Sequence, residues 1–109
     1  MISEEQVQAA FDWLQANELN AAEARAERVY LDEYRKSLKA ILMQEANAKT
    51  IGERETYAYS HDRYVEHLEK IRKAVVADET YRARISRSKM LLEFWRSQNA
   101  NARAVGAVG

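Results

Sequence analysis

The sequence predicts an all-α fold: an antiparallel helical hairpin that packs like a coiled coil and begins with a short extra helix. Two observations lead to this prediction. The chain has no proline and only three glycines, so it lacks the residues that form the tight turns of a β protein. Hydrophobic residues make up 47% and charged residues 31%, a mixture typical of helices with one apolar stripe and solvated faces. We expect a single helical domain over residues 1–103.

The first half of the chain predicts helices at about residues 4–16 and 21–48. Ser3 and Asn20 each precede a glutamine or glutamate by three residues, which is the spacing of a helix-capping box. A single bent helix is the alternative to a break at Asn20. Apolar side chains then recur every three or four residues, and Gly52 is the expected stop because glycine readily adopts the left-handed backbone that ends helices.

The second half predicts helices at 53–77 and 79–103, or one continuous helix. After Asp78 one apolar line of the heptad pattern turns basic, so we expect the buried face to rotate there. A bend, a discontinuity in the heptads and a change of packing partner are the three explanations. Small residues at 104–109 predict a flexible tail. The predicted core or dimer residues are Tyr64, Leu68, Ile71, Ile85, Leu92 and Trp95.

The segment beyond Asp78 needs a packing partner that the hairpin does not supply. A continuous helix over 53–103 would be about 75 Å long, and the preceding helix covers only about half of that length. We therefore expect a homodimer. A compact bundle, in which the chain folds back near Asp78, is the alternative.

The sequence carries no clear signal for catalysis, a cofactor, a metal or a membrane. The chain has no cysteine, so thiol chemistry is excluded. His61 and His67 do not share a helix face; we interpret His61 as a seam residue and His67 as a surface residue. No glycine-rich phosphate loop or serine nucleophile elbow is present. The acidic N-terminus does not resemble a signal peptide. We expect a cytoplasmic protein that is not an enzyme, with no cofactor and no membrane partner.

The strongest functional indication is the distribution of charge. Residues 1–69 carry 14 acidic and 8 basic side chains, whereas residues 70–109 carry 3 and 9. Four of the cations recur every seven residues, which aligns them along one side of a helix. We interpret this basic stripe as a nucleic-acid contact; pairing with the acidic half, or with an acidic protein surface, is the alternative. The stripe is Arg82, Lys89, Arg96 and Arg103, the flanking cations are Arg84 and Arg87, and the acidic candidates are Glu23, Glu27, Asp32 and Glu33.

The C-terminal half also has a tyrosine-bearing helix start, heptads after Tyr64, and a closing Glu93-x-Trp95-Arg96 followed by Ala102-Arg103. In these features it resembles small all-helical proteins encoded by tailed phages and prophages. The resemblance implies a non-enzymatic accessory of phage DNA replication or recombination, located in the host cytoplasm, and it implies no particular functional residue. The expected function is therefore interaction with nucleic acid or a nucleoprotein. A dimeric protein-interaction adaptor or inhibitor is the alternative.

Overall fold

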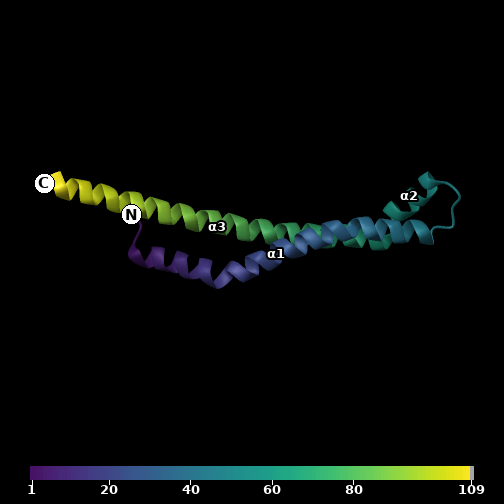
Figure 1. The fold of residues 1–109 in the computed structure, drawn as a ribbon, viewed down its shortest axis with the longest axis horizontal. Coiled ribbons are helices and arrows are strands. Elements are labelled where there is room, and N and C mark those ends of the chain that lie inside the picture. Colours follow the sequence, from purple (N-terminus) through teal and green to yellow (C-terminus); the bar gives the residue numbers. More distant parts are fainter. Residues whose placement is uncertain (109) are drawn as a thin grey trace. The chain divides into compact units, whose positions relative to one another are not determined.

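The computed structural model describes residues 1–108, and this part of the chain consists of three helices. They are α1 (Glu4–Glu45), α2 (Ile51–Ser60) and α3 (Asp62–Val108) (Figure 1). No strand occurs within residues 1–108, so the predicted all-α hairpin is confirmed. In place of the single domain expected from the sequence, the chain divides into two units. One is Ala22–Glu79, and the other combines Met1–Ala21 with the part of α3 that begins at Thr80.

α1 is one helix where the sequence predicts two. The capping box at its start is confirmed: the N–H of Gln6 donates to Ser3 Oγ at 3.2 Å, and the N–H of Ser3 donates to Gln6 Oε1 at 2.8 Å. The predicted break at Asn20 is absent because the asparagines bond along the helix instead of capping it. The amide of Asn17 donates to the carbonyl of Trp13 at 3.0 Å, and the amide of Asn20 donates to Asn17 Oδ1 at 3.4 Å.

Capping contacts, and not a left-handed glycine, form the connection between α1 and α2. The guanidinium of Arg54 donates to the carbonyl of Met43 at 2.9 Å and satisfies one of the last carbonyls of α1. Thr50 then caps α2, because its Oγ1 accepts the N–H of Glu53 at 3.2 Å. Gly52 lies inside the first turn of α2, and no glycine within residues 1–108 has a positive φ. The prediction that Gly52 stops the preceding helix is therefore wrong.

His61 separates α2 from α3, so the expected unbroken helix at 53–77 is wrong in its first part. The backbone of His61 is extended (φ −68, ψ 139), and its N–H donates to the carbonyl of Ala58 at 3.3 Å. Its ring Nδ1 accepts the N–H of Arg63 at 3.0 Å, and its carbonyl accepts the N–H of Tyr64 at 3.0 Å. One residue thus ends α2 and caps α3.

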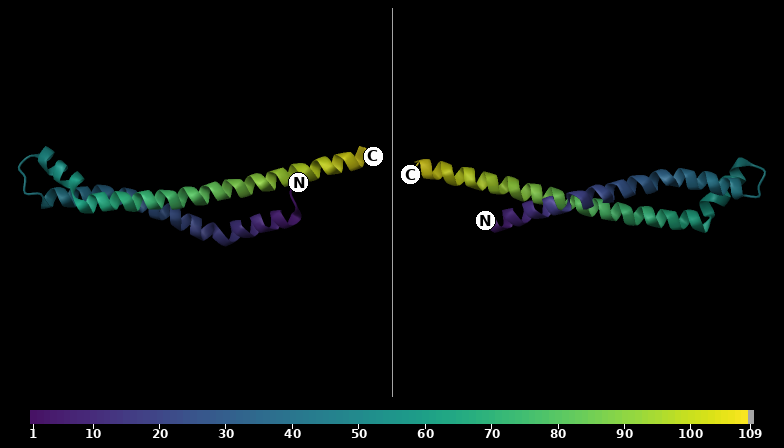
Figure 2. Two further views of the ribbon diagram at one scale, coloured as in Figure 1. Left: turned by 180° about the vertical axis from the view of Figure 1, so that it is seen from behind. Right: turned by 60° about the horizontal axis from the view of Figure 1, so that its bottom comes forward.

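Within residues 22–79, α1 and α3 lie side by side, and α2 lies at the end where the chain reverses (Figure 2). The core of this unit is at that end. Leu38 and Leu42 of α1 pack with Ala58 of α2 and Tyr64 of α3, with Met43 partly buried against them. The three helices are therefore joined by a core that contains few large side chains.

α3 runs unbroken through Asp78, and its buried face does not rotate there. The predicted rotation is wrong because the seam follows a different row of side chains, which includes His67 and Ala74. Leu68, predicted to be a core residue, lies off this seam and is 41% exposed. Of the other predicted core residues, one is buried and four are half-buried. The buried or half-buried seam is Tyr64, His67, Ile71, Ala74, Asp78, Tyr81, Ile85, Ser88, Leu92, Trp95 and Asn99.

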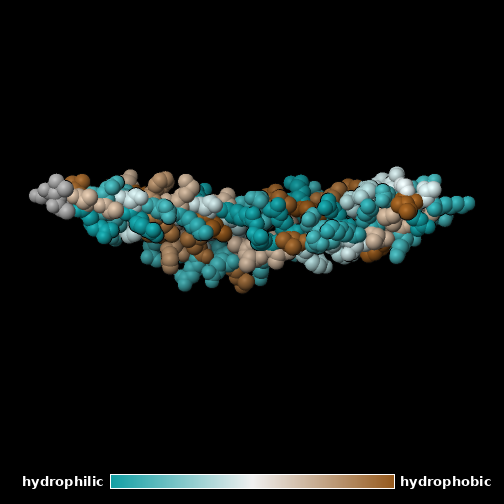
Figure 3. Space-filling model, turned by 45° about the horizontal axis from the view of Figure 1, so that its top comes forward, coloured by the Kyte–Doolittle hydropathy of each residue, from teal (hydrophilic) through white to brown (hydrophobic). Residues whose placement is uncertain are grey.

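The C-terminal residues continue α3 to Val108, within the segment 104–109 that the sequence predicts to be a flexible tail. The alanines in this segment favour helix. Gly109 lies outside the described residues. Apolar side chains, coloured brown in Figure 3, remain on the surface of the chain. None of the three helices described is long and apolar enough to cross a membrane.

Candidate nucleic-acid interface

The basic stripe lies on the uninterrupted helix α3. Its four cations are seven residues apart, which places successive charges about 10.5 Å apart along the helix axis. All four are exposed. The first three cations each follow directly after a seam residue, and Arg103 follows Ala102, which lies seven residues after the seam residue Trp95. The stripe therefore runs along one flank of the buried seam. The stripe residues are Arg82, Lys89, Arg96 and Arg103.

Arg84 and Arg87 do not extend this stripe. An α-helix turns about 100° per residue, so Arg84 lies about 160° and Arg87 about 140° around the helix from Arg82. The guanidinium of Arg84 stacks over the indole of Trp13, 4.4 Å from the ring centroid, which is a cation–π contact. The structure therefore separates the six predicted cations into a stripe of four and two that face elsewhere.

Two sets of contacts hold the first part of α1 against α3 in the unit that combines Met1–Ala21 with the part of α3 beginning at Thr80. Trp13 stacks on Tyr81 with ring centroids 6.4 Å apart. Nearer the N-terminus, the N–H of Ile2 donates to Gln98 Oε1 at 3.1 Å, and the amide of Gln98 donates back to the carbonyl of Ile2 at 3.0 Å. Sequence reasoning missed these pairs because their members lie far apart in the chain.

Charge is strongly separated within this unit. Residues 1–21 carry four acidic side chains and no basic one, whereas residues 80–108 carry six basic side chains and only Glu93 as an acid. Within residues 1–108, Lys89 and Arg96 form no ion pair. Their charges therefore face solvent.

Two of the acidic residues considered as partners of the stripe are engaged within α1. Arg35 Nη2 lies 3.4 Å from Asp32 Oδ1, and Lys36 Nζ lies 3.5 Å from Glu33 Oε2. Exposed pairs at this spacing stabilise a helix only slightly. Asp32 and Glu33 thus have cationic neighbours on their own helix.

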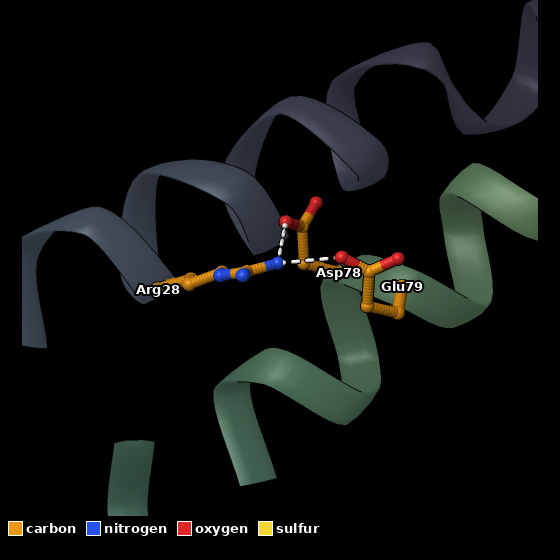
Figure 4. Close-up of polar contacts among 3 residues, drawn as sticks. All are labelled: Arg28, Asp78 and Glu79. Carbon is orange, nitrogen blue, oxygen red and sulfur yellow. Dashed lines mark hydrogen bonds and ion pairs between the residues drawn. The ribbon is translucent and has the colours of Figure 1, made fainter. Parts of the chain in front are cut away.

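A polar cluster that sequence reasoning missed lies between α1 and α3 within residues 22–79 (Figure 4). Arg28 Nη1 donates to Asp78 Oδ2 at 3.0 Å and to Glu79 Oε1 at 2.8 Å. Asp78 is only 1% exposed. These two hydrogen bonds raise the pKa of Arg28, the one that Glu79 accepts more than the one that Asp78 accepts. A buried charge of this kind needs its partner, so the cluster favours one alignment of the two helices.

The two histidines have structural roles in this fold. His67, predicted to be at the surface, is 5% exposed, and its Nε2 lies 2.7 Å from the carbonyl oxygen of Leu31. The centroids of the His67 and Tyr34 rings lie 5.5 Å apart. His61 is the cap between α2 and α3. In the part of the chain that the structure describes, no three histidine, aspartate or glutamate side chains gather in a way that could hold a metal ion.

Comparison of the chain with protein-family models, with curated proteins and with solved structures finds no match.

Proposed function

We propose that this protein is a non-enzymatic accessory protein that binds the phosphate backbone of nucleic acid through the basic stripe of α3 and acts as a homodimer in the cytoplasm. One observation carries the proposal: four exposed cations lie in one line on an unbroken helix. The resemblance to phage and prophage accessory proteins agrees with this role.

The arrangement favours contact with phosphates over reading of bases. Arginine and lysine neutralise phosphates and release their counterions, and this term does not depend on sequence. The regular spacing of the stripe gives a line of charge, and no asparagine or glutamine lies between its members on the same flank from Arg82 to Arg96. We therefore expect similar affinity for duplexes of unrelated sequence.

The test is fluorescence anisotropy with a labelled 24-base-pair duplex and a single strand of equal length, between 50 and 200 mM salt. Four phosphate contacts per chain predict that each bound chain contributes about −3.6 to the slope of log K against log salt for the duplex, which is about a hundredfold loss per chain over this range. Absence of duplex binding at 50 mM salt would overturn the proposal.

A pair of double variants tests whether binding depends on the stripe itself or only on the total positive charge of the chain. Lys89→Gln with Arg96→Gln should reduce the slope by about 2 for each bound chain. Lys36→Gln with Lys73→Gln removes the same charge from exposed positions in the other unit and should leave the slope nearly unchanged. Equal losses in the two double variants would contradict a specific role of the stripe.

The second candidate function is that of a protein-interaction adaptor. Tyr30 and Tyr34 are 62% and 38% exposed, and their rings stack with centroids 6.2 Å apart. Exposed aromatic residues are enriched at protein interfaces. Competition distinguishes the two functions: polyglutamate of matched charge should displace the duplex poorly if phosphate is the ligand, and well if the stripe recognises an acidic protein.

A further inference from the structure

We propose that residues 1–21 form an acidic arm that weakens phosphate binding by the basic stripe while docked on α3, and that leaves α3 when nucleic acid binds. The acidic arm is defined here as Met1–Ala21, which belongs to the same unit as the stripe. Its four acidic side chains are Glu4, Glu5, Asp12 and Glu18. The inference describes a regulation of the proposed interface and rests on that function, whereas the docking of the arm does not.

Two of the four acids lie on the same flank of the α1–α3 pair as the basic stripe. Trp13 and Arg84 mark the opposite flank, because they are in contact and Arg84 lies about 160° around α3 from Arg82. On α1, Glu18 lies about 140° and Glu4 about 180° around the helix from Trp13, and the half-buried side chains of the arm lie between these positions. Glu4 and Glu18 therefore lie on the flank of α1 that adjoins the stripe.

Glu4 and Glu18 also lie at the level of the stripe along the helix axes. The cation–π contact and the hydrogen bonds described above fix the antiparallel register of the arm on α3. In this register Glu4 is within about one turn, or 5.4 Å, of the level of Arg96, and Glu18 is within about one turn of Arg82. Packed helices lie about 8 to 10 Å apart, which is comparable to the Debye length in 0.1 M salt. The charges of the arm and of the stripe therefore act on one another.

Both acids add negative potential to the flank where phosphate would bind. Within residues 1–108 neither Glu4 nor Glu18 forms an ion pair. In the free protein their field attracts the stripe across the flank, whereas a bound phosphate would meet the same field as repulsion. The arm and a phosphate chain are therefore competitors for one line of cations.

The arm is attached to α3 by few contacts. Within residues 1–21 no residue is fully buried, and the specific contacts are those of the Trp13 ring and the two hydrogen bonds with Gln98. Segments with few buried contacts open at the lowest free energy. Because packing supplies most of the stability of a helix in a protein, a released arm would fray and its amide hydrogens would exchange quickly.

Two double variants of the full chain test the competition in the anisotropy assay. Glu4→Gln with Glu18→Gln removes the two charges that adjoin the stripe and should raise duplex affinity about threefold at 50 mM salt, because repulsion over about 10 Å is only partly screened there. Glu5→Gln with Asp12→Asn is the matched control: it removes the same charge from exposed positions on the outer side of the arm and should raise affinity less. Equal gains in the two double variants, or no gain in the first, would overturn the proposal.

Hydrogen–deuterium exchange followed by mass spectrometry tests the release of the arm. A saturating amount of the 24-base-pair duplex should speed the exchange of amides in residues 5–20 several-fold and leave residues 38–64, which contain the core of the hairpin, unchanged. Slower or unchanged exchange in the arm on duplex binding would overturn the release.

Exchange without nucleic acid separates the arm from the proposed function. In the free protein, Lys89→Gln with Arg96→Gln should speed exchange of the arm because its attraction to the stripe is lost, whereas Lys36→Gln with Lys73→Gln should not. Failure of the wild type to bind the duplex would overturn the proposed function and the regulation together, leaving only the docked arm. Duplex binding with arm exchange that none of these changes affects would overturn the regulation alone.

Discussion

Truncation of Leu42 to alanine tests where the core of the hairpin lies. Leu42 is 0% exposed and packs with Leu38, Ala58 and Tyr64. The change removes three carbon groups worth about 0.8 kcal/mol each in transfer from water, and the cavity that remains adds a further term. We expect the free energy of unfolding to fall by about 3 kcal/mol, measured by urea unfolding followed by circular dichroism.

Leu68→Ala is the matched control for Leu42→Ala. The heptad pattern read from the sequence places Leu68 in the core, whereas in the structure it is 41% exposed. Its truncation leaves little cavity, and the loss should be about 1 kcal/mol. Both variants are compared at one protein concentration, because the proposed dimerisation would couple stability to concentration. Equal losses, or a greater loss for Leu68→Ala, would refute the seam that the structure assigns.

Three further changes test local features. Asp78→Asn weakens the charged hydrogen bond to Arg28 in the seam and should lower the unfolding free energy by about 1 to 2 kcal/mol; a neutral result in urea unfolding would contradict this role. Thr50→Ala removes the cap of α2 and should cost about 1 kcal/mol, whereas Thr50→Ser should retain stability in the same assay. The hydrogen bonds from Arg72 lower the pKa of Glu69, so stabilisation by this pair is present above the ordinary pKa and is lost as pH falls through the lowered one. Arg72→Gln should raise the pKa of Glu69 in an NMR titration, and an unchanged midpoint would contradict the pairing.

The sequence predicts the helical class and the first cap but not the helix boundaries. Absence of proline and scarcity of glycine exclude a turn-rich fold whatever the packing. Asn20, Thr50 and His61 show why the boundaries are less certain, because a side chain that can cap a helix can also bond within one. Asn20 bonds within a helix, whereas Thr50 caps α2. The capping pattern of Thr50, with a glutamate three residues later, is visible in the sequence.

The seam of α3 is obscured in the sequence because polar residues occupy it. His67, Asp78 and Ser88 are buried, while the exposed Leu68 follows one position after His67. A hydrophobicity pattern therefore selects the wrong row. Arg28, fifty residues earlier, provides a charged partner for Asp78 in the seam, and sequence spacing does not reveal that contact.

The basic stripe is easier to predict because it needs only an unbroken helix. Arg82 and Arg96 are aligned by their spacing alone, whatever packs against α3. Arg84 differs because its environment depends on Trp13, 71 residues earlier in the chain, which it contacts through the face of the ring. Local geometry thus predicts which cations share a line along the helix. Tertiary packing decides which cations contact a distant part of the chain, as Arg84 does.

NMR of the arginine side chains tests the central claim, that the stripe binds phosphate, most directly. In a titration with a 24-base-pair duplex at 50 mM salt, we predict that the Nε–H signals of Arg82, Arg96 and Arg103 shift. Arg25, an exposed arginine on α1 in the other unit, should shift little. Shifts of equal size at Arg25 and at the stripe, or no shift at the stripe, would contradict the account.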